Sequence, residues 1–130
     1  MSQEAPMSFW SSSPTSPFQV DEPRVRGRWI NGQPPLVRPD PSYSEWEIER
    51  AGSQDRHPYD ETNFLLEGEL FVESGGRTVR LQPGDMVRVS AGHTGRYWAP
   101  VYARMFGIDG PNPTGAASSD FDYWEIEGEE

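Results

Sequence analysis

The feature that most constrains the fold is a regular alternation of short apolar runs and turn residues between His57 and Gly95. The runs at 62–66, 70–73, 78–81 and 86–89 are separated by Glu67-Gly68-Glu69, by Gly75-Gly76 and by Gln82-Pro83-Gly84-Asp85. Paired glycines accept the positive φ of a tight hairpin turn, and proline followed by glycine is typical of a second turn type. The stretch therefore predicts an antiparallel meander.

Strand patterns also flank this meander. Residues 44–50 alternate with Trp46 and Ile48 on one face and three glutamates on the other, and 101–108 reads as a closing strand. Residues 51–59 read as a polar loop, and 121–126 as a candidate last strand. No segment shows a sustained apolar period of 3.6 residues, so we predict an all-β chain with a double-sheet jelly roll.

The order of strands and turns resembles the cupin superfamily. Its first motif reads G-x5-H-x-H-x3,4-E-x6-G and its second G-x5-P-x-G-x2-H-x3-N. The first motif is matched by His57, Glu61 and Gly68, and the second by Gly84 and Gly92. The departures are Asp55 at the first histidine, Ser90 at the proline and Gly95 at the last histidine.

The resemblance is nearest to small cupins of the ethanolamine-utilization and ureidoglycine-related type. Their last histidine is often replaced, and their next strand carries an aromatic and an Arg-aromatic pair. Tyr97, Trp98 and Arg104-Met105-Phe106 fit that pattern. The resemblance covers residues 43–108 and implies a single-domain cupin jelly-roll β-barrel.

A chain of 130 residues suits one domain. We expect a flexible Ser/Pro-rich arm at 1–22, a barrel at 23–112 with its core at 43–108, and a linker, possible last strand and acidic tail at 113–130. The arm carries Phe9, Trp10 and Phe18, which suit docking on the barrel or on a partner subunit.

Composition excludes several kinds of chemistry. The chain has no cysteine, and all 11 of its basic residues are arginine, which rules out thiolate and lysine Schiff-base mechanisms. A net charge of −10 opposes binding to nucleic acid. No long apolar run or signal-peptide pattern is present, so we expect a cytoplasmic protein that does not bind membranes.

His57 and Glu61 are the candidate catalytic residues. In a dry barrel, a carboxylate beside an imidazole suits both groups to acid/base work near neutral pH. Alternation along the strand predicts that Asn63 faces inward with Glu61, whereas Asp60 faces away. In the alternative interpretation neither residue has a functional role: His57 lies on a loop tip, and Glu61 caps the backbone or pairs with an arginine.

Further substrate-binding candidates lie on the later strands: Arg88, Tyr97, Tyr102 and Arg104. An inward arginine would recognise an acidic substrate group or pair with Glu61. The alternatives are arginines on a solvated face and aromatic side chains that fill the core.

The resemblance also implies a metal site, for which we expect either no cofactor or one divalent transition metal. Its ligands would be His57 and Glu61 with His93, provided that the backbone near His93 is extended. A turn at Ala91-Gly92 would send His93 to solvent instead. Asp55 is another possible third ligand.

Three functions follow. The first is an acid/base enzyme of isomerase, lyase or cyclase type acting on a carbonyl- or carboxylate-containing metabolite. The second is a non-catalytic ligand-binding cupin, and the third is a metal-dependent, dioxygenase-like cupin. In each case the partner is a small molecule, and we expect a homodimer.

Overall fold

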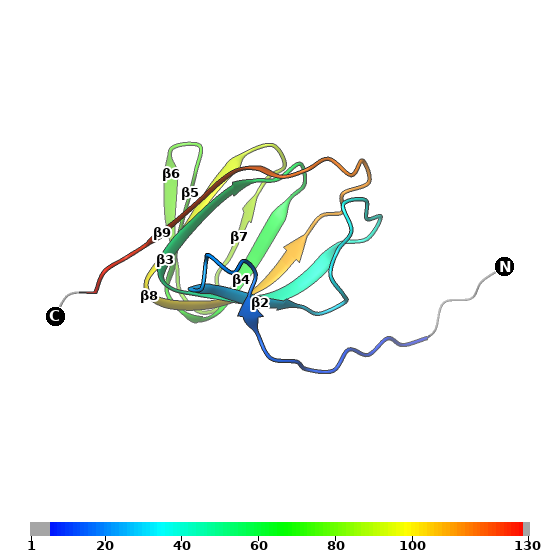
Figure 1. Ribbon diagram of the computed structural model, residues 1–130. Coiled ribbons are helices and arrows are strands. Elements are labelled where there is room, and N and C mark those ends of the chain that lie inside the picture. Colours follow the sequence, from blue (N-terminus) through cyan, green and yellow to red (C-terminus); the bar gives the residue numbers. More distant parts are fainter. Residues whose placement is uncertain (1–5, 129–130) are drawn as a thin grey trace.

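The computed structural model describes residues 6–128, which form nine strands and no helix. The strands are β1 (Ser16–Pro17), β2 (Val25–Trp29), β3 (Ser42–Arg56), β4 (Glu61–Gly68), β5 (Leu70–Ser74), β6 (Arg77–Leu81), β7 (Met86–Val89), β8 (Thr94–Asp109) and β9 (Ser119–Glu125). Figure 1 shows them curled around a common interior. The predicted all-β jelly roll is confirmed. No helix of the described residues is long and apolar enough to cross a membrane.

The two longest strands, β3 and β8, run through both layers of the barrel. The first half of β3 and the second half of β8 lie in a layer ordered β1-β2-β3-β8-β4-β7. Their other halves lie in a layer that also contains β5, β6 and β9. All of these pairings are antiparallel.

A corner in β3 allows the chain to change layers. The register with β8 shifts between Glu49 and Ala51, and Arg50 between them has a φ of 46°. A bulge of this kind bends a strand and increases its local twist. The two halves of β3 therefore face each other across the interior.

The inward faces of the strands form one apolar core. Trp46 and Ile48 from β3 pack with Leu65 from β4, Leu70 from β5 and Met105 from β8. Of these five residues only Trp46 retains measurable exposure, at 8%. Alternation along each strand accounts for the pattern, because every second side chain points inward.

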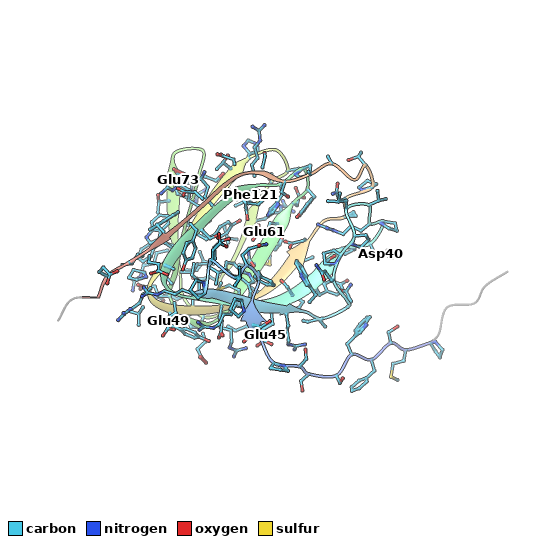
Figure 2. The ribbon with its side chains drawn as sticks, viewed as in Figure 1. Asp40, Glu45, Glu49, Glu61, Glu73 and Phe121 are labelled. Atoms are coloured by element: carbon cyan, nitrogen blue, oxygen red, sulfur yellow. The ribbon has the colours of Figure 1, made fainter. Side chains whose placement is uncertain are left out.

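The outward face of β3 carries ion pairs. Glu45 contacts Arg28 on β2 and Arg104 on β8, while Glu47 contacts Arg26 on β2. Figure 2 shows Glu45 and Glu49 at the outside of the barrel and Glu61 within it. The predicted division of 44–50 into a core face and a polar glutamate face is therefore confirmed.

The predicted strands of the meander are present as β4 to β7, with Gly75 and Gly76 at positive φ in the turn between β5 and β6. The polar loop expected at 51–59 was wrong over most of its length, because β3 continues to Arg56. Pairing with both β8 and β9 holds this polar segment extended. The first five residues of the expected arm, and Glu129 and Glu130 of the expected tail, lie outside the described residues.

Candidate functional site

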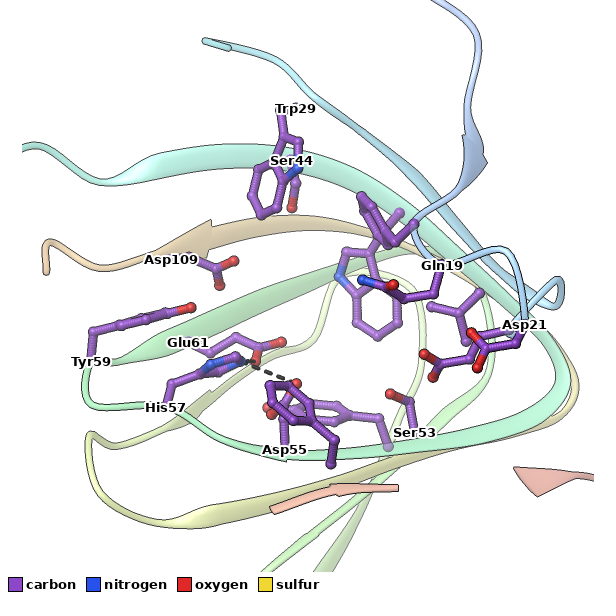
Figure 3. Close-up of a pocket in the computed structure, with 16 residues that line it drawn as sticks. Gln19, Asp21, Trp29, Ser44, Ser53, Asp55, His57, Tyr59, Glu61 and Asp109 are labelled. Carbon is purple, nitrogen blue, oxygen red and sulfur yellow. Dashed lines mark ion pairs between the residues drawn. The ribbon is translucent and has the colours of Figure 1, made fainter. Parts of the chain in front are cut away.

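A cavity of about 540 Å³ opens at one end of the barrel. Its walls combine strands β2, β3, β4 and β8 with the segment before β2 and with Phe121 of β9. Figure 3 shows the cavity with a polar cluster at one end and Gln19 and Asp21 at the other. The polar cluster contains His57 and Glu61, which the sequence placed in the first cupin motif.

Asp55, His57 and Glu61 form this cluster. Asp55 is near the end of β3, His57 follows that strand, and Glu61 begins β4. Nε2 of His57 lies 3.1 Å from Oδ2 of Asp55 and 2.9 Å from Oε1 of Glu61. The imidazole thus sits between two carboxyl groups, all turned into the barrel (Figure 3). This arrangement disagrees with the alternative interpretation of an isolated histidine on a loop tip.

Two neighbours fix the His57 ring. Its Nδ1 shares a hydrogen bond with Oγ of Ser118, which comes from the segment before β9. The ring also stacks on Tyr59, with 4.6 Å between centroids. A partner on Nδ1 sets which nitrogen faces the cluster, so Ser118 directs Nε2 toward Asp55 and Glu61.

The two oxygens of Glu61 have different partners. Nδ2 of Asn63 donates to Oε2 at 2.9 Å, and Oδ1 of Asn63 accepts from Nε1 of Trp46 at 2.7 Å. The other oxygen, Oε1, is buried and receives no hydrogen bond of acceptable angle, although His57 is its ion-pair partner. The core thus fixes one oxygen of the carboxyl group by a hydrogen bond, and the other oxygen faces the imidazole of His57.

Tyr97 supplies a second unsatisfied polar atom. Its side chain lines the cavity at 2% exposure, and its hydroxyl has no hydrogen-bond partner. A Cβ built on Gly95 would lie 3.0 Å from this hydroxyl and 2.9 Å from the ring. Gly95 pairs with Asp55 across β3 and β8. The Tyr97 ring therefore occupies space beside the position where the second motif of the family has its histidine.

Asp109 is a further carboxyl group in the wall, at the end of β8 and paired in register with Glu61. Burial, followed by the charge of Glu61, raises the pKa of Asp109 to about 8, although His57 and Arg38 oppose the shift. At neutral pH this side chain is largely a carboxylic acid, which can donate a hydrogen bond.

The central cluster shifts two more pKa values. Burial lowers the pKa of His57, but its contacts with Asp55 and Glu61 outweigh burial and raise the pKa to about 11. Burial and the charge of Glu61 raise the pKa of Asp55 to about 6, against the opposing effect of His57. His57 is therefore an imidazolium at neutral pH, and it neutralises part of the carboxylate charge.

The cluster also fits a divalent metal ion. Asp55, His57 and Glu61 each present one ligand atom, and the three atoms lie within 4.8 Å of one another. Oε1 of Glu61, which faces Nε2 of His57, is one of the carboxylate oxygens that would bind the ion. An imidazole with two carboxylates suits iron, manganese or zinc. Binding would require His57 to lose its Nε2 proton.

The predicted metal set of His57, Glu61 and His93 is not assembled. His93 is exposed, and its backbone N–H donates to the carbonyl of Ser90 in the turn before β8. This turn sends the side chain to solvent, which was the alternative considered above. Asp55 takes the third position in the cluster instead.

Three predicted substrate-binding residues also need correction, because Arg88, Tyr102 and Arg104 do not line this cavity. Tyr102 donates to Glu47 and Arg104 to Glu45 on the outside of the barrel, and Arg88 is exposed on β7. Their positions on the strands point them outward. Tyr97 faces inward and lines the cavity, whereas Asn63 faces inward as predicted but does not line it, because it lies buried against Glu61 and Trp46.

Sequence reasoning missed Asp109, Tyr59 and Ser118. Asp109 shares the inward side of β8 with Met105 and Gly107, so strict alternation along the closing strand would have found it. Tyr59 and Ser118 lie in connections, where no period indicates side-chain direction.

The comparisons with known proteins agree with this architecture. Residues 44–101 match the cupin domain of the Cupin_2 family. The chain therefore contains a cupin domain over these residues. No match was found among curated protein sequences.

Solved structures share the fold at low identity. The EutQ protein of Clostridium difficile is 20% identical, with a TM-score of 0.58 over 68% of this chain and 68% of that one. KdgF from Halomonas sp. is 17% identical, with a TM-score of 0.61 over 79% and 93%. An RmlC-like cupin from Shewanella frigidimarina is 16% identical, with a TM-score of 0.64 over 85% and 95%. These likenesses establish the fold alone.

Proposed function

We propose that this cupin is an enzyme that moves a proton at the carbon next to a carbonyl group of a small metabolite, in an isomerase, lyase or cyclase type of reaction. The observation that carries the proposal is the Glu61 carboxyl group in the cavity wall, whose Oε2 is held by Asn63 while Oε1 faces Nε2 of His57 at 2.9 Å. A carboxylate oriented in this way beside an imidazole is suited to act as a general base.

The other groups of the site complete this chemistry. Glu61 takes the proton from carbon, and the electron pair of the broken C–H bond moves toward the carbonyl oxygen. His57, as an imidazolium, and the hydroxyl of Tyr97 stabilise the resulting enolate oxygen by hydrogen bonds. The proton then returns to a different carbon, or the electron pair expels a leaving group at the β position.

The location of the arginines favours the carbonyl-containing substrate over the carboxylate-containing one. Arg88 and Arg104 were the groups expected to recognise a carboxylate, and both lie outside the cavity. His57 is the cationic candidate that remains in the wall, and both neighbouring carboxyl groups already engage it.

Deuterium exchange tests the proposal without knowledge of the natural substrate. Dihydroxyacetone and aminoacetone are incubated with the protein in D₂O, and loss of the α-proton signals is followed by NMR. We expect exchange above the buffer rate, and a fall of about 10² or more in Glu61→Gln, because general-base catalysis contributes on that order. Glu67→Gln is the matched control, because Glu67 is on the same strand with an exposed side chain.

The outcomes separate the functions. Exchange that persists in Glu61→Gln, or protein that exchanges neither ketone, contradicts the acid/base proposal. A protein that binds these ketones without exchange supports the non-catalytic alternative instead.

A metal-dependent enzyme is the second candidate, favoured by the three converging ligand atoms of Asp55, His57 and Glu61. These residues would hold the ion, which would supply Lewis-acid polarisation of a carbonyl group. In that case chelation abolishes exchange and a divalent metal restores it. Under the metal-free mechanism, exchange is unaffected by the chelator.

A further inference from the structure

We infer that the ligand of this cavity carries a positive charge, in the form of an amino or quaternary ammonium group. The inference deepens the proposed function by naming the substrate class of the same site, and it rests on that proposal only for the position of the carbonyl end. Three observations carry it: the charge of the walls, the aromatic rings at the mouth and the unsatisfied polar atoms in the interior.

Carboxyl groups dominate the cavity wall. Five residues contribute one each, namely Asp21, Glu22, Asp55, Glu61 and Asp109. No arginine lines the cavity, and His57 is the one cationic side chain that does among the described residues. Even with His57 charged and Asp109 protonated, three of the carboxyl groups have no cation to balance them within the wall. An anionic ligand would meet repulsion here, whereas a cation would be attracted.

Two arginines of β2 are engaged on the outside of the barrel, and a third arginine lies behind the cavity. Arg26 and Arg28 on β2 pair with Glu47 and Glu45 on the outside of the barrel. Arg38 is buried over the ring of Tyr59, 4.3 Å from its centroid, and does not line the cavity. Of these three side chains, only Arg38 offsets part of the negative potential of the wall, because its charge acts on Asp109.

Aromatic rings line the outer part of the same cavity. Phe18 lies 5.7 Å from Trp29 between centroids, and Phe121 of β9 adds another ring. Phe18 and Phe121 are 36% and 71% exposed, so they sit toward solvent, whereas Tyr97 is 2% exposed. The negative face of an aromatic ring attracts cations, and ring clusters of this kind suit quaternary ammonium groups.

Two carboxyl groups accompany these rings. Asp21 is exposed and Glu22 is partly buried, and neither forms an ion pair within residues 6–128. Figure 3 places Asp21 across the cavity from His57 and Glu61. The mouth therefore combines aromatic faces with free negative charge, which together suit an ammonium group.

The interior supplies independent evidence that a ligand is accommodated. The hydroxyl of Tyr97 is buried in the wall without a hydrogen-bond partner, and Oε1 of Glu61 has an ion-pair contact with His57 but no further partner among the described residues. Buried polar groups without hydrogen-bond partners cost free energy unless a bound molecule supplies the missing hydrogen bonds. A ligand with its polar end at these atoms and its cation at Asp21 and Glu22 satisfies both ends of the cavity.

Isothermal titration with three molecules of one shape tests the charge directly. Choline is the cation, 3,3-dimethylbutan-1-ol replaces its nitrogen with carbon, and 3,3-dimethylbutanoate is an anion. The titrations contain a chelator, so that bound metal does not contribute. We expect choline to bind at least about tenfold more tightly than the alcohol, equivalent to about 1.4 kcal/mol, and the butanoate to bind least.

Variants locate the effect at the mouth. Asp21→Asn combined with Glu22→Gln should weaken choline binding about threefold to tenfold and leave binding of the alcohol unchanged. The matched control is Glu67→Gln with Asp122→Asn, two exposed carboxylates that do not line the cavity. Thermal melting shows that each variant is folded.

The inference is overturned if choline does not bind, if the alcohol or the butanoate binds as tightly, or if the mouth variant retains full preference for choline. Failure of the proposed function looks different. In that case choline binds with the expected preference, while neither ketone exchanges deuterium.

Discussion

Asp109 shares the inward-facing side of β8 with Ala103, Met105 and Gly107, yet it is a carboxyl group. Burial is the main cause of its raised pKa of about 8, and the facing carboxyl group of Glu61 adds to it. The ordinary value is 3.8, so between these two values the folded state binds more protons than the unfolded state. The contribution of Asp109 to stability is therefore lost as the pH rises from about 4 to 8.

We expect Asp109→Asn to stabilise the protein in a pH-dependent way, because asparagine resembles the neutral acid and does not ionise. Urea unfolding should show little difference at pH 4, and at pH 9 the variant should be more stable by at least about 1.4 kcal/mol, which corresponds to one unit of the pKa difference. His57, whose pKa is raised to about 11, also loses stabilisation above pH 6.5, but it does so in both proteins. Asp40→Asn, at an exposed position outside the cavity, is the control. A difference that is constant with pH, or that shrinks as the pH rises, contradicts this assignment.

At the scale of elements, sequence patterns identified the strands but not every side-chain direction. Trp46 and Ile48 alternate so regularly that the core face of β3 could be assigned, and glycine pairs located the turns. The inward face of the closing strand was harder to assign, because Tyr102 and Arg104 lie on one face of the strand and Met105 and Asp109 on the other. Tyr102 and Arg104 were predicted to bind substrate because they are polar, but they form hydrogen bonds with Glu47 and Glu45 outside the barrel.

The connections account for the rest of what the sequence did not reveal. His57 and Glu61 could be placed because their spacing matches a motif, and that motif also placed Asp55 at a ligand position. Ser118 reaches His57 from 61 residues away, and nothing in the local sequence indicates that contact. It depends on β9, which brings the C-terminal segment back along β3.

Strand β9 packs closely on β3 at Gly52, and this contact is open to test. A Cβ on Gly52 would lie 2.0 Å from Cζ2 of Trp124, so an alanine must displace the indole. We expect Gly52→Ala to destabilise the protein by about 1–3 kcal/mol and to speed amide hydrogen exchange across β9 more than across β4.

A double-mutant cycle provides the control for this prediction. With Trp124→Ala the indole is absent, so adding Gly52→Ala should cost much less than it does in the native chain. Additive effects of the two substitutions, or unchanged exchange in β9 of Gly52→Ala, would show that the close contact does not hold β9 in place.

At the scale of the whole molecule, large apolar side chains on the N-terminal segment remain exposed. Met7, Phe9 and Trp10 are 81%, 84% and 51% exposed, although Ser16 and Pro17 pair with β2. The net charge of −10 repels a second copy, so association must come from apolar contact. We propose a homodimer in which this segment packs on the partner subunit.

Light scattering after gel filtration tests the dimer. We expect a mass of twice the 14.7 kDa chain at micromolar concentration, and tighter association at higher salt, because salt screens the repulsion between acidic subunits.

Phe9→Ser with Trp10→Ser should shift the protein toward monomer without lowering its melting temperature at a concentration where both proteins are monomeric. The control is Val101→Ser, which removes a side chain that is 74% exposed on β8. A native chain that elutes as a monomer excludes the dimer. The two substitutions remove the apolar area that drives association in this proposal. If the Phe9→Ser/Trp10→Ser variant remains dimeric, the interface therefore lies on another surface.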